Sequence, residues 1–454
     1  MRQNERGPED EKVIWKSYLP TAPRSPSFSS WSSPFVWVTF GIGCLASSGL
    51  ILRYGVNVFF LDEWDLASLL FQGIMQGDSL WSAVWEQANE HRPVLSRLAF
   101  YLLSLLPSLD LRFLMIFNQL LLWLTVFPLF ASIQGRSSHT FLICFLVLVS
   151  FLSPTHHSNQ FWSMQLMWYA IWFGGIYSCY FLSKPKLTKT DFAAGLSAAF
   201  FAYFGGLAGA VCLLNGLVML ALRCVSEKKY VPQLLLWLLF TLGALLYYFS
   251  DFQSSGRSLF YFAFHPLETL IFACVMLANL VGTDYAPVSA AVGGLGLVYF
   301  AFLFWQKRFD RNLFIFGIIQ NALAASLVIS IGRAEFQLEQ AFAHYGMVTM
   351  PFWIGLILLA NPPRRFHRFF LLFIGMMLLI TFNKKWQGLE RSYANRERGV
   401  QCYHAVIAHP ESINPDILPF RDCKFLGPAE FRQDTIQKIL KLKDLGIRFP
   451  QNTQ

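Results

Sequence analysis

The sequence has few charged residues for its length. Only 14% of its 454 residues are Asp, Glu, Lys or Arg, whereas soluble domains average about 25%. Hydrophobic residues make up 55% of the chain and occur in blocks of about 20, the length that crosses the hydrocarbon layer of a bilayer. A single soluble core stops growing at roughly 250–300 residues. The composition therefore predicts a protein embedded in lipid and excludes an ordinary soluble domain.

Signatures of other protein classes are missing as well. The sequence contains no RNA- or DNA-reading motif, no Cys/His spacing typical of zinc and no evident internal repeat of the kind found in many transporters. The net charge of +9 fits basic membrane loops better than a nucleic-acid partner. Residues 1–33 are polar and the first apolar block starts late, so they are expected to form a cytoplasmic tail rather than a signal peptide.

Long apolar runs predict an all-α polytopic membrane protein with about 11–13 transmembrane helices. The block 192–222 is either one strongly tilted helix or two helices broken at its glycine-rich centre. Three runs separate Arg223 from Lys307, so either one of them is re-entrant or interfacial, or one of the two basic clusters lies outside. The predicted spans are 34–52, 111–133, 140–153, 166–182, 192–222, 234–250, 267–283, 288–305, 313–331, 346–360 and 369–383.

Basic clusters between the spans indicate the orientation. Clusters that begin at Lys184, Arg223, Lys307 and Arg364 should face the cytoplasm by the positive-inside rule. Four segments are then expected outside: loop 53–110, the turn around residues 154–157, the segment from Arg333 to Tyr345, and the tail from Lys384.

The chain is therefore expected to consist of a cytoplasmic tail (1–33), a transmembrane domain (34–383) and an extracytoplasmic segment (384–454). The last segment should form only a small cap, because about 70 residues support a thin core. An amphipathic pattern predicts a helix at 429–444. Cys402 and Cys423 lie in this polar region and could pair if it faces an oxidising compartment.

Three carboxylates, Asp62, Glu63 and Asp65, follow the first span. Their place near the membrane boundary would remove water from them, which raises a carboxyl pKa and suits general-base chemistry. The alternative is an acidic helix start, favoured by the positive end of the helix dipole. Oxygen ligands of this kind also suit a divalent metal, which the motif neither requires nor excludes.

His91 and Arg92 form a second polar group before Pro93. Arg offers a bidentate fork and His a further donor, so the pair could hold a phosphate or a carboxylate; the alternative is a solvated loop turned by the proline. An interfacial amphipathic helix is predicted from Leu80 to Trp85. The apolar run from Val94 to Leu106 is too short to span and should lie along or dip into the interface.

A third polar group lies at the ends of two late spans and contains Arg333, His344 and Tyr345. Charged groups at membrane depth are costly and are functional candidates. Arg333 could neutralise a lipid phosphate, with His344 and Tyr345 as donors. The alternative is a local salt bridge from Arg333 to Glu335 or Glu339.

The order of first span, Asp-Glu pair, interfacial helices, His-Arg-Pro and apolar run resembles the GT-C superfamily of polyprenyl-phosphate-sugar-dependent glycosyltransferases. The nearest branch contains the protein O-mannosyltransferases and the lipid A aminoarabinose transferases. The resemblance implies that Asp62 or Glu63 is the catalytic carboxylate and that a late outside loop, here around Arg333, binds the donor. His91 would sit on a His-Pro-Pro-like motif, although this chain has one proline and an inserted arginine. The motif likeness covers residues 59–93.

These observations predict transfer of a sugar from a polyprenyl-phosphate donor to a glycan, lipid or protein acceptor. The reaction would take place on the outward face of a multi-pass protein, in a bacterial inner membrane. The alternatives are a lipid or solute transporter or flippase, and a non-catalytic assembly protein. The predicted catalytic residues are Asp62 and Glu63, and the predicted substrate-binding residues are Asp65, His91, Arg92, Arg333, His344 and Tyr345.

Overall fold

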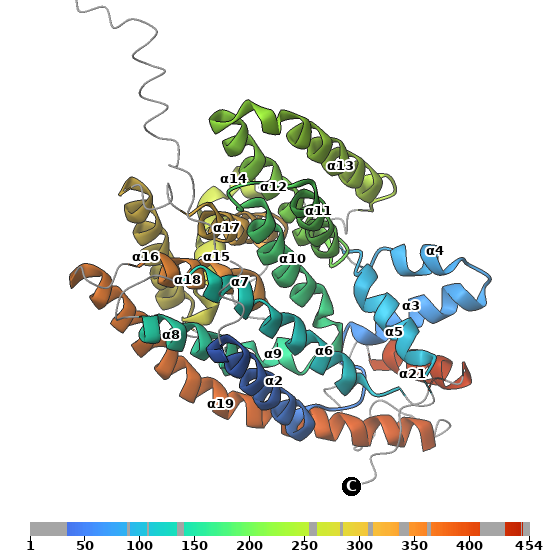
Figure 1. Cartoon of the computed structure of the whole chain (residues 1–454). Coiled ribbons are helices and arrows are strands. Elements are labelled where there is room, and N and C mark those ends of the chain that lie inside the picture. The colour runs from blue at the N-terminus through green and yellow to red at the C-terminus, as the bar shows by residue number, and fades with distance from the viewer. Residues whose placement is uncertain are drawn as a thin grey trace, which may run out of the picture.

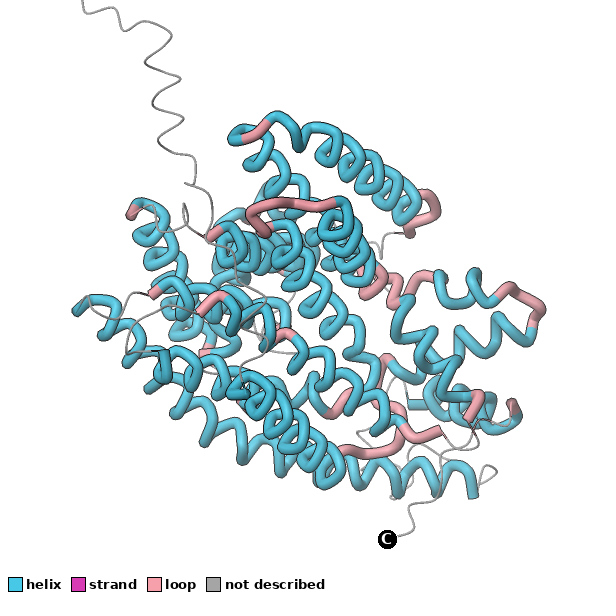
Figure 2. Tube along the Cα trace, in the orientation of Figure 1, coloured by secondary structure: helices cyan, strands magenta, loops and turns pink. Residues whose placement is uncertain are grey.

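The described part of the chain is built from helices. The computed structural model describes residues 34–88, 91–106, 109–133, 140–253, 261–281, 285–306, 312–335, 345–360, 365–408, 432–445 and 447, and these residues contain no β-strand (Figure 2). In lipid a backbone must satisfy its own N–H and C=O groups, which a helix does within one segment. The all-α polytopic membrane class expected from the sequence is confirmed.

Seven of the described helices are long and apolar enough to cross a bilayer, by length and composition. Other apolar helices are shorter, so the number of crossings stays a prediction. The seven candidates are α2 (Pro34–Tyr54), α6 with α7 (Leu111–Leu124 and Val126–Ala131), α12 (Leu207–Ser226), α13 (Val231–Phe249), α16 (Ala286–Trp305), α17 (Leu313–Arg333) and α19 (Arg365–Ala408). The shorter helices include α8 (Thr140–Leu152), α10 (Leu166–Leu182), α15 (Pro266–Leu277) and α18 (Gly346–Leu359).

A glycine turn divides the longest apolar block into two helices, which is one of the two arrangements that the sequence allowed. α11 (Lys189–Tyr203) ends before the turn, and α12 starts after it. Gly206 has a φ of 145°, a conformation that residues with a side chain rarely adopt. A Cβ on Gly209 would lie 1.9 Å from the carbonyl oxygen of Ala202. The end of α11 and the start of α12 can therefore pack this closely only because position 209 has no side chain.

The first loop forms a group of short helices at one side of the bundle (Figure 1). Asn57 closes its base, because the side-chain amide donates to the carbonyl of Leu109 at 3.1 Å and Oδ1 accepts from the backbone N–H of Leu111 at 2.8 Å. The two ends of the loop are thus held together beside the spans. Helices occupy both stretches where interfacial helices were expected. The helices of the loop are α3 (Glu63–Met75), α4 (Leu80–Trp85) and α5 (Val94–Ser104).

The C-terminal part continues the last predicted span without a break. α19 is a single helix of 44 residues that passes through position 384, where the sequence suggested that the transmembrane domain ends. Its sequence contains no proline, so nothing interrupts the helix where its residues change from apolar to polar. At 1.5 Å per residue it is about 66 Å long, roughly twice the hydrocarbon thickness. α21 (Arg432–Asp444) matches the helix expected at 429–444 and packs against both α3 and α19.

The bundle has two chemically different ends. α10 starts directly after η3 (Ser163–Gln165) and finishes just before Lys184, a rise of about 25 Å. At the Lys184 end, Arg223 donates to the Lys184 carbonyl, so two of the basic clusters that were expected on one side do lie together. At the η3 end lie the first loop and, against it, α21 (Figure 1). We call this second end the loop end.

Candidate functional site

The acidic segment makes a strained turn before α3. Leu61 has a φ of 47°, in the left-handed region that costs a residue other than glycine about 1–3 kcal/mol. The N–H groups of Glu63 and Trp64 donate to the carbonyls of Phe60 and Leu61, each at 3.1 Å. Asp62 is the capping residue of α3, yet its carboxylate makes no capping hydrogen bond. Strain of this kind is typical of functional sites, and here it presents Asp62 instead of using it as a cap.

Glu63 points into the protein. Only 1% of the residue is exposed, and its carboxylate accepts hydrogen bonds from the N–H of Phe60 at 2.7 Å, the N–H of Met164 at 2.8 Å and the hydroxyl of Ser163. Burial raises its pKa to about 7, although these donors and Arg396 act in the opposite direction. This geometry ties the first loop to η3 and does not fit the catalytic role that the sequence suggested for Glu63.

Asp62 lies among charges from distant parts of the chain. Its side chain reaches solvent, but the protein around it removes enough water to raise its pKa, and the like charge of Asp65 raises the pKa further. The positive charge of Arg333, at the end of α17, acts in the opposite direction. Because such interactions weaken with distance, Asp62 and Arg333 lie near each other at the loop end.

Asp65 is engaged by the C-terminal helix. Lys438 of α21 forms ion pairs with both Asp65 and Asp434. Asp65 remains 48% exposed, so its carboxylate is shared between this contact and solvent. The residue expected to bind substrate therefore also contacts α21 from the first turn of α3.

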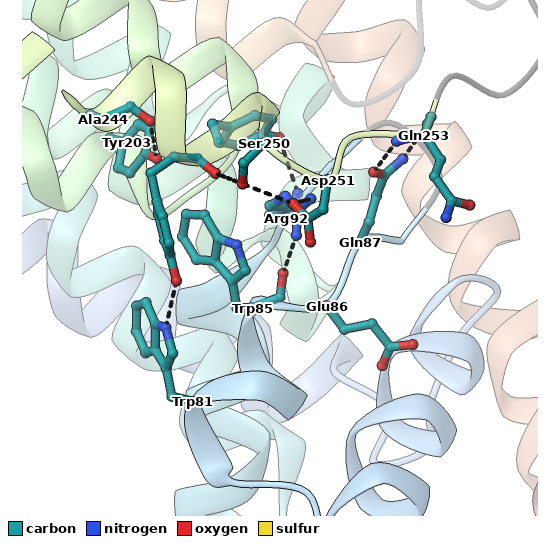
Figure 3. A network of polar contacts seen from close by, with 12 residues as sticks. Trp81, Trp85, Glu86, Gln87, Arg92, Tyr203, Ala244, Ser250, Asp251 and Gln253 are labelled. Atoms are coloured by element: carbon teal, nitrogen blue, oxygen red, sulfur yellow. Dashed lines mark hydrogen bonds and ion pairs between the residues drawn. The ribbon is translucent and has the colours of Figure 1, made fainter. Parts of the chain in front are cut away.

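Arg92 is buried in a protein contact instead of facing a ligand (Figure 3). Its side chain is 2% exposed, pairs with Asp251 at 2.6 Å and donates to the carbonyl of Trp85 at 2.8 Å. The guanidinium also lies over the rings of Trp85 and Tyr248. Beside it, Gln87 and the backbone of Gln253 exchange two hydrogen bonds, of 2.6 and 3.0 Å. The expected phosphate clamp is thus a joint between the first loop and the end of α13.

His91 and Tyr345 lie far apart in the sequence but contact the same aromatic ring. His91 forms a small bridge with Ala88, and its ring contacts Trp168 edge-on at 6.3 Å. Tyr345, which is buried, contacts Trp168 edge-on at 5.6 Å. His344 lies outside the described residues. Trp168 thus joins the first loop to the late segment, independently of the interaction between Asp62 and Arg333.

Several residues of this end were not singled out from the sequence. Ser163 and Lys438 each contact one of the expected site residues, and Trp168 contacts two. Arg396 of α19 donates to the carbonyl of Phe161 and lies 4.7 Å from the ring centre of Phe60. Their residue types are ordinary for a span, a cap or a long helix. Only the folded chain places them beside the acidic segment.

The carboxylates do not form a metal centre in this arrangement. Within the described ranges, no group of three His, Cys, Asp or Glu side chains is placed to hold a metal ion. Of the three expected ligands, Glu63 is occupied by protein donors and Asp65 by Lys438. The donor set therefore does not fit the divalent metal that the sequence left open.

Comparisons with models of known protein families, with curated proteins and with solved structures give no match. Only the chain's own residues therefore bear on its function.

Proposed function

We propose that this membrane protein is a glycosyltransferase that moves a sugar from a polyprenyl-phosphate donor to an acceptor hydroxyl. The observation that carries the proposal is that Asp62 and Arg333 lie near enough at one end of the bundle for the charge of Arg333 to lower the pKa of Asp62. A carboxylate that can accept a proton lies beside a cation that can hold a phosphate. The two groups are what a displacement with a phosphate leaving group requires.

The reaction is a single displacement at the anomeric carbon. The acceptor oxygen forms a bond to this carbon, the bond from the carbon to the phosphate oxygen breaks, and the configuration inverts. Asp62 takes the acceptor proton, and its raised pKa makes it a stronger base than a fully solvated aspartate. Polyprenyl phosphate leaves with its negative charge against Arg333, while Tyr345 and His344 serve as further donors. Glu63 positions the segment and takes no part in the transfer of the acceptor proton.

We propose that the loop end faces away from the cytoplasm, in a bacterial inner membrane. The basic clusters of Lys184 and Arg223 lie at the other end, as the positive-inside rule requires of a cytoplasmic face. Cys402 of α19 is disulfide-bonded, which favours an oxidising compartment; Cys423, its expected partner, lies outside the described residues. Both observations support the same orientation.

The test is donor turnover by the purified protein in vesicles. Polyprenyl phosphates that carry glucose, mannose, galactose or arabinose are supplied with water as the acceptor, and release of polyprenyl phosphate and free sugar is followed. At least one donor should turn over, and Asp62→Asn and Arg333→Ala should each lower kcat/KM at least about 100-fold. Asp78→Asn and Arg391→Ala, which change exposed charges elsewhere, are the matched controls. Wild-type rates in the two site variants contradict the proposal, as does lipid movement without loss of sugar, which is the transporter's behaviour.

A further inference from the structure

A groove of about 730 Å³ separates α3 from α21, and the proposed chemistry does not use it. This volume lies within the range of about 300–1,000 Å³ that is usual for small-ligand sites. Asp65, Ser68, Leu69 and Gln72 form one wall, and Gln87 with Ala88 closes one side. The tail supplies the other wall: Asp434, Gln437, Lys438, Leu440, Lys441 and Asp444.

The groove carries one more negative charge than positive, because three aspartates and two lysines line it. Lys438 is paired with both Asp65 and Asp434, so this cation is already neutralised by two carboxylates. Lys441 and Asp444 add one charge of each sign. An anionic headgroup would meet excess carboxylate, and an acyl chain would meet charged walls. The groove therefore favours a polar ligand that carries no negative charge.

Two glutamine side chains of the groove are available to form hydrogen bonds with such a ligand. Within the described chain, the side chains of Gln72 and Gln437 have no hydrogen-bond partner, and they face the groove from opposite walls. Each amide offers two donors and an acceptor. Leu69, Leu440 and Ala88 add small apolar patches between these groups. A sugar chain matches this lining, because its surface alternates hydroxyl groups with C–H faces.

The groove leads to the proposed catalytic carboxylate. Asp65, Ser68, Leu69 and Gln72 follow helical spacing, so they share one face of α3, and Asp62 lies one turn before Asp65 on that face. Asp62 and Asp65 also lie near enough for their charges to interact. A chain bound along α3 would therefore bring its end to Asp62 and to the neighbouring Arg333.

We propose that the groove between α3 and α21 binds a neutral oligosaccharide, which is the acceptor of the sugar transfer. Its role as acceptor rests on the proposed function, whereas its binding does not. The C-terminal helix is then part of the substrate site, because it forms one entire wall. The donor approaches from the lipid side at Arg333, and the acceptor approaches along α3 from the aqueous side.

Binding is tested with the full chain in lipid nanodiscs. The probes are hexasaccharides of α-1,4-glucan, β-1,4-glucan and α-1,6-mannan, together with a threonine-rich peptide of similar length. Saturation-transfer NMR should show contact with at least one hexasaccharide. The double variant Gln72→Leu/Gln437→Leu should weaken that binding at least about tenfold. The control, Gln76→Leu/Gln401→Leu, changes two exposed glutamines outside the groove and should bind as the wild type does.

Three results would overturn the inference: no hexasaccharide binds, the groove variant binds as tightly as the control, or only the peptide binds. Failure of the proposed function has a different readout. Donor turnover in the absence of acceptor should stay within about twofold of wild type in the groove variant, because neither glutamine lies at Arg333. Unchanged donor turnover in Asp62→Asn would remove the catalytic role and leave the oligosaccharide binding intact.

Discussion

Asp62 and Glu63 are adjacent carboxylates with opposite surroundings. Glu63 is enclosed and accepts three hydrogen bonds, while Asp62 reaches solvent beside a second aspartate and an arginine. The strained backbone of Leu61 precedes them and lets the two side chains point in different directions. One residue therefore fixes the segment and the other is presented for chemistry.

The pH dependence of turnover should report on Asp62. A base works in its ionised form, so activity should fall as the pH falls through the raised pKa of Asp62. Asp65→Asn removes the like charge and lowers that pKa. The acid limb of kcat/KM should therefore move to lower pH. Asp78→Asn is the matched control and should leave the profile in place, and a shift to higher pH in Asp65→Asn would contradict the assignment.

The pH dependence of stability should report on Glu63. Its pKa is about 7 when folded, against 4.5 for the free group, so the folded state binds more protons between these values. Its contribution is fully present below pH 4.5 and is lost as the pH rises through 7, by up to about 3 kcal/mol. The Tm of wild type should therefore fall relative to Glu63→Gln between pH 5 and 8. A constant difference in Tm would show that Glu63 does not titrate in this range.

At the scale of elements, α21 is held mainly by apolar burial. Ile436, Ile439 and Leu442 are at most 2% exposed, and loss of such a side chain costs about 2–5 kcal/mol. The partly exposed ion pairs of Lys438 contribute only about 0–1 kcal/mol. Ile439→Ala should therefore increase amide hydrogen exchange over 432–444 far more than Lys438→Ala does, with Gln437→Ala as the exposed control. The reverse order would show that charge holds the helix.

The sequence was a good guide to elements and a poor guide to their contacts. Apolar period and length predicted the all-α membrane class, and glycines 205, 206 and 209 lie where one of the two predicted arrangements places the break between α11 and α12. The loss of hydropathy near 384 predicted the end of the last span, but it did not predict whether the helix ends there too. α19 continues there, since polar residues remain good helix formers once outside lipid.

At the scale of the whole molecule, the two ends should be accessible from opposite sides of the membrane. Single cysteines at Asp78 and Gln437, in a chain with Cys44 and Cys224 replaced by Ser, should react with an impermeant maleimide on intact cells. A cysteine at Lys186, next to the basic cluster, should react only after permeabilisation. α3 contacts α21, so positions 78 and 437 must behave alike. Labelling of 186 from outside would invert the proposed orientation.

The sequence by itself determined that the protein is embedded in lipid, that its fold is all-α, and where the polar segments lie along the chain. These follow from composition and from period, which are local properties. The tertiary structure decided which polar residues meet. It buried Arg92 against Asp251, turned Glu63 inward, and brought Asp62, Arg333 and α21 to one end. The physical reason is that side chains distant in sequence become neighbours only when helices pack, and one sequence pattern is compatible with many packings.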